Sequence, residues 1–170
     1  HALSILPDYP LVPDSDPPVI SDVLGGQPIT FNVAVPALPV FPSGVVNWWS
    51  PEELKQLFIN TLETISWTGY NSTMILSGAR ARLSMPDTHA WITGIFKERQ
   101  MPNGYFRMMG GGFGHDHRGN YSEQVAAAGI VSEMLMQSVE GIVRLFPAWP
   151  GHLDARFERL LAEGGFEISA

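Results

Sequence analysis

The chain has 170 residues, no cysteine and a formal net charge of −7, with ten Lys and Arg residues in all. This charge argues against nucleic acid and anionic membranes as partners. The missing thiols exclude disulfides, thiolate zinc sites and cysteine nucleophiles. The apolar fraction of 45% is that of a globular protein. No apolar run approaches the roughly 20 residues that cross a bilayer, so we expect no membrane span.

Residues 1–45 contain most of the prolines. Proline interrupts helices and sheets, and only Ile29–Val35 alternates in the manner of a strand. A compact domain seldom opens with about 45 residues that lack regular structure. We therefore expect a proline-rich extended arm that lies across something larger. The chain opens with His-Ala-Leu rather than methionine, as a processed or truncated polypeptide would.

Residues 46–140 have the pattern of helical hairpins. Ser50-Pro51-Glu52-Glu53 is a strong helix start, with a serine cap, proline at the first position and an early glutamate. Its apolar stripe continues to Ile65. A second helix is predicted from Ser72 to Leu83, where Gly78, Ala79 and Ala81 would permit close contact. A third begins at Asp87 or Thr88 and includes Phe96.

The fourth predicted helix follows a glycine-rich loop and begins at Asn120 or Ser122. Two apolar rows make a wide stripe along it as far as Leu135. Residues 141–170 then read as the start of a β-rich domain. Ile142–Phe146 has strand character, Phe157–Leu161 is predicted as a short helix, and Phe166–Ser169 as a strand with no partner downstream.

The segment Glu133-Met-Leu-Met-Gln-Ser138, followed by Gly141-Ile-Val-Arg-Leu-Phe-Pro-Ala-Trp-Pro150 and by residues 155–170, resembles the end of the catalytic domain of glycoside hydrolase family 95. That family contains α-L-fucosidases and related exo-glycosidases with an (α/α)6 barrel. The resemblance covers roughly residues 45–170. It implies a mainly α fold, with helical hairpins forming part of such a barrel between the arm and the start of a C-terminal β domain.

The resemblance also implies inverting hydrolysis of a glycosidic bond, in which an acid and a base stand about 6.5–9.5 Å apart. It places the general acid and the water-activating asparagines upstream of this chain. We therefore expect the chain to work with the remainder of the same polypeptide or with a companion chain, on an oligosaccharide or glycan, without a cofactor. Glu123 is the nearest match to the family's supporting acid, and Asn120 and Gln124 flank it. A secreted or periplasmic location goes with this expectation.

Several candidate site residues allow more than one interpretation. Glu123 either caps its helix or serves as an acid in a sugar pocket, and the helix dipole favours its ionised form. His115 and His117 either bind sugar hydroxyls, ligate a metal or sit in an exposed loop; we predict no metal, because two histidines are too few. Trp48 and Trp49, with Asn47, either present a flat face to a pyranose or anchor the arm to the helices.

Other residues have plainer roles. Glu133 is predicted to be a structural hydrogen-bond partner. Arg80 and Arg82 are predicted to pair with Glu52, Glu53 or Glu63 on the surface. The glycine run 110–114 fits neither nucleotide-binding fingerprint, so a phosphate cradle is rejected. The rival to a hydrolase is a non-catalytic carbohydrate-binding or scaffold protein that keeps the same helical layer.

Overall fold

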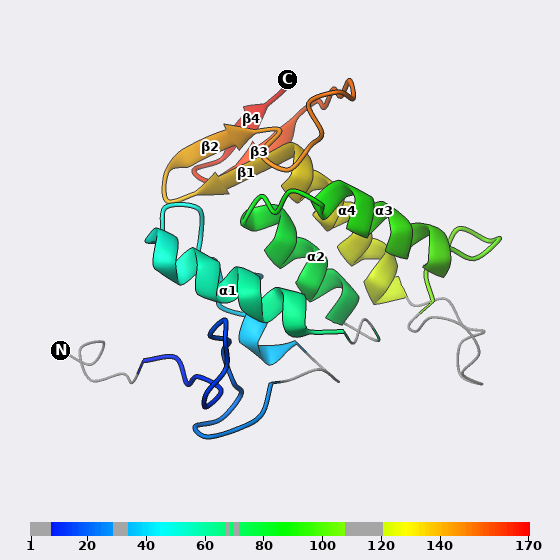
Figure 1. Cartoon of the computed structure of the whole chain (residues 1–170). Helices are drawn as coiled ribbons and strands as arrows, with labels where there is room; N and C mark the ends of the chain where they lie inside the picture. Colours follow the sequence, from blue (N-terminus) through cyan, green and yellow to red (C-terminus); the bar gives the residue numbers. More distant parts are fainter. Residues whose placement is uncertain (1–7, 29–33, 67–68, 70–71, 108–120) are drawn as a thin grey trace.

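The computed structural model describes residues 8–28, 34–66, 69, 72–107 and 121–170, with the side chains of 121–124 excepted. In this part of the chain, four helices form a layer and two short hairpins lie together at one end of it (Figure 1). The elements are η2 (Val35–Ala37), α1 (Glu52–Thr64), α2 (Ser72–Arg82), α3 (Thr88–Arg99), α4 (Tyr121–Leu135), β1 (Met136–Val139), β2 (Ile142–Leu145), β3 (Leu160–Ala162) and β4 (Phe166–Ile168).

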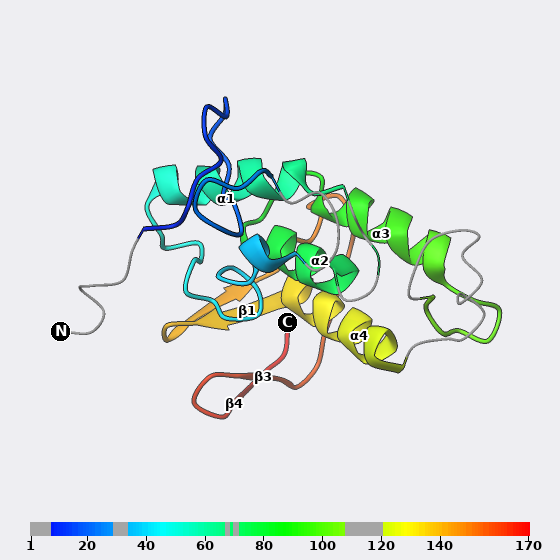
Figure 2. The ribbon, with the colours of Figure 1, turned by 90° about the horizontal axis from the view of Figure 1, so that it is seen from below.

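The chain reverses direction from each helix to the next, as the predicted hairpins require (Figures 1 and 2). α2 is the central helix and packs against α1, α3 and α4. Nearly all of its residues are buried. Small side chains make this possible, because they let neighbouring backbones approach from several sides. The described residues form a helical layer but no closed barrel.

Two apolar cores lie on opposite sides of α2. The first joins Phe58 and Leu62 of α1 to Leu76 of α2 and to residues of the predicted arm. The second joins Met74 and Ala81 of α2 to residues of α3 and α4, including Ile92, Ile130 and Met134. The apolar stripe predicted for α1 therefore faces the interior. Of the two rows predicted for α4, the row with Ala127, Ile130 and Met134 does so, whereas Ala128 and Val131 of the other row are exposed.

The described part of the arm lies across α1 and α2 and contributes Ile20, Ala37, Val40 and Val46 to the first core. The Ile20 backbone N–H donates to Thr61 Oγ1 at 2.9 Å, in the middle of α1. The strand predicted over Ile29–Val35 falls mostly outside the described residues, and Val35 itself begins η2. The arm is thus part of the helical core, and burial of apolar surface holds it there.

Both predicted helix caps have other partners. Ser50 Oγ accepts the Asn47 N–H at 3.0 Å, while Pro51 occupies the cap position of α1 without a side-chain bond. Asp87 precedes α3, but its carboxylate accepts from Arg80 Nη1 at 2.8 Å. The helices begin where they were predicted to begin, although Ser50 and Asp87 form hydrogen bonds with residues that precede the helices instead of with the first turns.

The C-terminal predictions need two corrections. β1 and β2 pair antiparallel across Glu140-Gly141, so one hairpin crosses the predicted boundary at 140/141. Phe157–Leu161 forms no helix; its last two residues belong to β3, which pairs with β4. The strand at Phe166 therefore has an upstream partner. Pairing with β4 satisfies the backbone groups of Leu160 and Leu161, and Phe157 N–H donates to Ala170 O at 2.8 Å.

The apolar character of α4 extends around the helix. Ala127, Ile130 and Met134 are buried, yet Val125 and Val131 on other sides are 55% and 38% exposed. A helix that is apolar on every side is usually buried on every side. Its outer face therefore has the composition of a packing surface. Among the described helices, none has both the length and the apolar content needed to span a membrane.

Gly78 tests the packing around α2. A Cβ at this position would lie 2.5 Å from the Phe41 ring, a separation that requires the ring or the helix to move. Although alanine favours helix, we expect Gly78→Ala to lower the free energy of unfolding by about 1–3 kcal/mol through overpacking. Urea denaturation followed by circular dichroism measures this change.

The control is Gly129→Ala in α4, where an added Cβ meets nothing within 4 Å. We expect this variant to be as stable as the parent or more stable by up to about 1 kcal/mol, from helix propensity alone. Equal effects of the two substitutions would contradict the close contact between α2 and Phe41.

Candidate functional site

Trp48 and Trp49 precede α1 and are both half-exposed, at 40% and 49%. Their ring centroids lie 4.8 Å apart with the planes inclined at 54°. We call these two indoles the tryptophan surface. Neither indole is buried in the apolar core. The largest aromatic side chain of the first core, Phe58, is fully buried by comparison.

Asn47 sets the turn that presents the tryptophan surface. Its side chain is buried, Nδ2 donates to Gly44 O at 3.1 Å, and Oδ1 accepts the Trp49 N–H at 2.8 Å. Gly44 has a φ of +72°, which favours glycine. Both polar atoms of the Asn47 side-chain amide thus have backbone partners. In this structure the side chain therefore positions Trp49.

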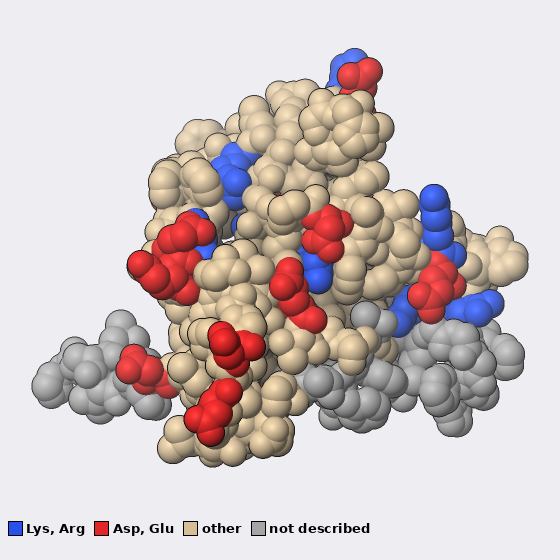
Figure 3. All heavy atoms as spheres, in the orientation of Figure 1, with Lys and Arg blue, Asp and Glu red and all other residues tan. Residues whose placement is uncertain are grey.

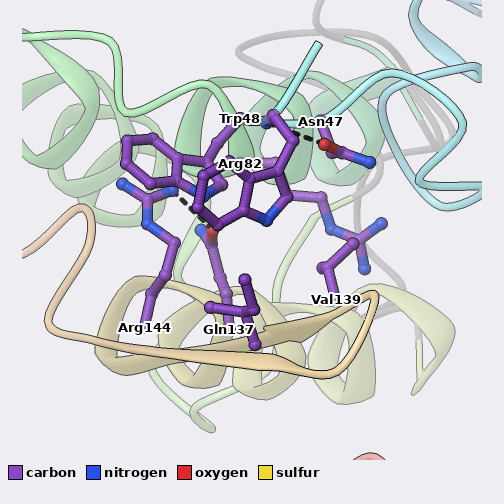
Figure 4. Close-up of a pocket in the computed structure, with 8 residues that line it drawn as sticks. Asn47, Trp48, Arg82, Gln137, Val139 and Arg144 are labelled. Carbon is purple, nitrogen blue, oxygen red and sulfur yellow. Dashed lines mark hydrogen bonds between the residues drawn. The ribbon is translucent and has the colours of Figure 1, made fainter.

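The β1–β2 hairpin supplies the polar side of the site (Figure 4). The Arg144 guanidinium carbon lies 4.1 Å from the centroid of the Trp48 ring, a cation–π contact. Arg144 Nη1 donates to Gln137 Oε1 at 3.2 Å and Nη2 to Ser84 Oγ at 3.1 Å. Burial lowers the pKa of Arg144 from its ordinary value, and the group remains a cation at neutral pH.

Arg82 lies at the end of α2 and joins three parts of the chain. Its Nε and Nη2 donate to the two oxygens of Glu133 in α4, at 3.1 and 2.9 Å. Nη1 donates to the backbone oxygens of Val40 and Pro42, at 3.3 and 3.1 Å. Glu133 is therefore the structural partner that the sequence predicted. The partners predicted for Arg80 and Arg82 were wrong, because these side chains turn inward to Asp87 and Glu133.

Gln137 continues this network into the hairpin. It is 4% exposed, and its Nε2 donates to Ala81 O at 2.9 Å and to Glu133 O at 3.1 Å. Ala81 O is one of the last carbonyls of α2, which have no partner within the helix. Gln137 thereby provides a hydrogen-bond donor for a carbonyl at the end of α2, and its Oε1 accepts a hydrogen bond from Arg144.

The hollow enclosed by these side chains is small. A water centre can occupy about 10 Å³ of it, which corresponds to roughly one water molecule. A sugar ring would therefore bind over the exposed indoles rather than inside the hollow. An open groove of about 400 Å³ adjoins it and shares Arg82 and Val139 with it. Ser43, Ser138 and Glu163 also line that groove.

Of the other predicted site residues, the structure places only Glu123 and Gln124, at the opposite end of α4. Glu123 and Gln124 lie in its first turn, and their side chains are outside the described residues, as are Asn120, His115 and His117 entirely. From Glu123 to Leu135, beside Gln137, α4 rises by about 18 Å at 1.5 Å per residue. The predicted residues whose backbone the structure describes therefore fall into two groups, one at Trp48 and one at Glu123, which a single sugar ring does not span.

Sequence reasoning did not assign Gln137, Arg144 or Arg82 to a site. The signal was present, because Glu133, Gln137 and Arg144 all lie in the segment 133–150 that carries the family resemblance. The structure gathers them between α2 and the tryptophan surface. What the sequence alone could not supply was their proximity to Trp48, which is about 90 residues away along the chain.

Within the described residues, no three His, Asp or Glu side chains come together as metal ligands would. Comparisons of the chain with protein-family models, curated proteins and solved structures found no match. The assignment of a function therefore depends on the geometry of the site and on the residues themselves.

The Arg82–Glu133 ion pair should stabilise the fold measurably, because both side chains are largely shielded from water, at 15% and 22% exposure. A double-mutant cycle with Arg82→Met, Glu133→Gln and the double variant should give a coupling energy of about 1–3 kcal/mol, between the values of exposed and buried pairs. Chemical denaturation of the four proteins provides it.

The matched control is Arg159–Glu167, which has the same two-point geometry at 3.0 and 2.9 Å but whose side chains are 75% and 50% exposed. We expect a clearly smaller coupling there. A coupling energy at Arg82–Glu133 no larger than in this control would contradict the claim that this ion pair stabilises the fold more than an exposed one does.

Proposed function

We propose that this chain is the saccharide-contacting helical part of an exo-acting glycoside hydrolase resembling the α-L-fucosidases of family 95. The observation that carries the proposal is the tryptophan surface: two adjacent indoles that stay half-exposed beside buried Gln137 and partly buried Arg144. Exposed apolar area rimmed by polar groups is typical of a binding surface. The C–H face of a pyranose fits an indole, while its hydroxyls pair with amide and guanidinium groups.

The geometry of the turn supports a binding role over a packing role. Asn47 and Gly44 hold Trp48 and Trp49 outward through hydrogen bonds that involve no indole. A rigid aromatic surface loses little conformational entropy when a ligand covers it, because its side chains are already ordered. Such preorganisation favours binding of weakly interacting ligands such as sugars.

The hydrolytic part of the proposal is supported by the resemblance of residues 133–150 and by the position of Glu123. This residue lies in the first turn of α4, where the helix dipole stabilises an ionised carboxylate. An ionised carboxylate is suited to orienting or activating water rather than to donating a proton. The acid that protonates the leaving oxygen is proposed to come from the remainder of the polypeptide or from a companion chain.

The exposed face of α4 supports completion by more protein. Val125 and Val131 lie on the outer side of a helix whose inner side is already packed. In an (α/α)6 barrel, further helices would cover this face. A glycan substrate is consistent with a secreted or periplasmic location.

Trp49→Ala tests the saccharide surface. Removing the indole deletes the stacking area but leaves the Asn47 turn, which uses only the backbone of residue 49. We expect affinity for oligosaccharides to fall about tenfold or more, as for other aromatic anchors. Calorimetry on a panel of oligosaccharides measures this, with Tyr105→Ala as the control, because Tyr105 is comparably exposed at 44%. Equal affinities of the Trp49 variant and the parent would contradict the proposal.

The rival function, saccharide binding without chemistry, is favoured by one observation: no carboxylate lines the hollow at Trp48. Glu123→Gln separates the two. If the chain belongs to a hydrolase, turnover of α-fucosides or α-galactosides by the chain together with the remainder of its polypeptide or its companion chain should fall by orders of magnitude, while oligosaccharide affinity at the tryptophan surface stays the same. Unchanged turnover in that complete protein would remove Glu123 from the mechanism, and an absence of turnover in the complete parent protein together with retained binding would establish the rival.

A further inference from the structure

The positive charge of Arg144 has no carboxylate partner among the described residues. The two arginines of α2 differ from Arg144 in this respect, because Arg80 forms an ion pair with Asp87 and Arg82 forms one with Glu133. Arg144 instead donates to two neutral oxygens, Gln137 Oε1 and Ser84 Oγ. No Asp or Glu lines the hollow that it enters. A partly buried, uncompensated cation is unusual, because removing charge from water is unfavourable unless a partner offsets it.

The hydrogen bonds of Arg144 leave most of its donors free for a ligand. A guanidinium has five N–H groups, and the contacts to Gln137 and Ser84 use one on each terminal nitrogen. These two contacts fix the plane of the group, since Gln137 is itself held by Ala81 O and Glu133 O. Arg144 is therefore oriented before a ligand arrives, and a fixed guanidinium edge matches the two oxygens of a carboxylate.

The Trp48 ring lies directly beside this charge, 4.1 Å from the guanidinium carbon. A ligand on the tryptophan surface would thus have its ring against an indole and its substituents near Arg144. We infer that Trp48 and Arg144 form a subsite for an acidic sugar residue, in which a uronic acid carboxylate binds the guanidinium while the sugar ring rests on the indoles. This inference rests on the proposed saccharide binding and names the class of sugar that occupies the surface.

Charge elsewhere on the molecule does not prevent this. Acidic side chains are spread over α1 and the arm in the view of Figure 3, and Glu52, Glu53 and Glu63 of α1 are exposed. Such charges are screened beyond about 8 Å at physiological ionic strength. Glu133, the carboxylate that the network brings nearest to Gln137, is neutralised by Arg82. Local contact with Arg144 therefore decides the preference.

Two ligands that differ at one group test the inference. The probe is an oligosaccharide that ends in glucuronic acid, and its partner is the same oligosaccharide after reduction of the carboxylate to a primary alcohol. Calorimetry on the purified protein should show the acidic ligand binding about tenfold or more tightly than the reduced one, because hydrogen bonds to charged groups are the stronger kind. Raising the salt concentration should shrink this difference.

Arg144→Gln should abolish the preference, so that this variant binds the acidic and the reduced ligand with equal affinity. Arg144→Lys, which keeps the charge but loses the planar fork, should retain only part of it. Arg159→Gln, at an exposed arginine of the other hairpin, should behave as the parent does. Thermal melts identify any variant that fails to fold, and the comparison of two ligands on the parent protein needs no variant.

The outcomes separate the two proposals. Equal affinity of the parent for both ligands would overturn the acidic subsite and leave saccharide binding in place. Absence of binding by either ligand would overturn the proposed function together with the subsite. A preference for the acidic ligand that persists in Arg144→Gln would also overturn the subsite, since another cation would then be responsible.

Discussion

The guanidinium of Arg82 is the interaction on which the rest of this structure depends. It lies at the end of the central helix, where backbone carbonyls have no partner within the helix, and its four hydrogen bonds reach α4 and the loop at 40–42. Phe41 of that loop covers Gly78 and stacks on Arg82, 5.0 Å away. One side chain thus fixes the arm, α2 and α4 relative to one another. Gln137 extends the same network to the β1–β2 hairpin.

This arrangement explains why two tryptophans stay on the surface. The loop from Val40 to Trp49 is held by Arg82 at its start and by the Asn47 turn at its end. The hairpin, held by Gln137, brings Arg144 against Trp48 from the other side. The indoles are therefore positioned by polar contacts around them rather than by burial. A binding surface constructed in this way is ordered before the ligand arrives, which is what a weak, hydroxyl-rich ligand requires.

The helices were predictable because their signals are local. Apolar periodicity placed the stripes of α1 and α4, and the predicted second helix, Ser72–Leu83, differs from α2 by one residue. The expected capping bonds are absent because Ser50 and Asp87 accept from Asn47 and Arg80, three and seven residues earlier in the chain, instead of from the first turns of their helices. The partner of Arg82 was missed because it is 51 residues away along the chain. Phe157–Leu161 was misjudged because strand pairing with Phe166–Ile168 depends on a turn with positive φ at Gly164 and Gly165.

Within the site, the sequence indicated Asn47, Trp48 and Trp49 but not Gln137 and Arg144. Gln137 and Arg144 have unremarkable local contexts, and only folding places them beside the indoles. Glu123 drew attention through its residue type, and it belongs to the far end of α4. An oligosaccharide that contacts both Glu123 and the tryptophan surface would therefore have to extend over about 18 Å along that helix.

The central claim is that the junction between the Asn47 turn and the β1–β2 hairpin receives the saccharide. Hydrogen–deuterium exchange of the purified protein, with and without a saturating oligosaccharide, tests it most directly. The account predicts slower exchange in residues 44–50 and 137–145 when the ligand is present. Slowing confined to the first turn of α4, or no change in either segment, would contradict it.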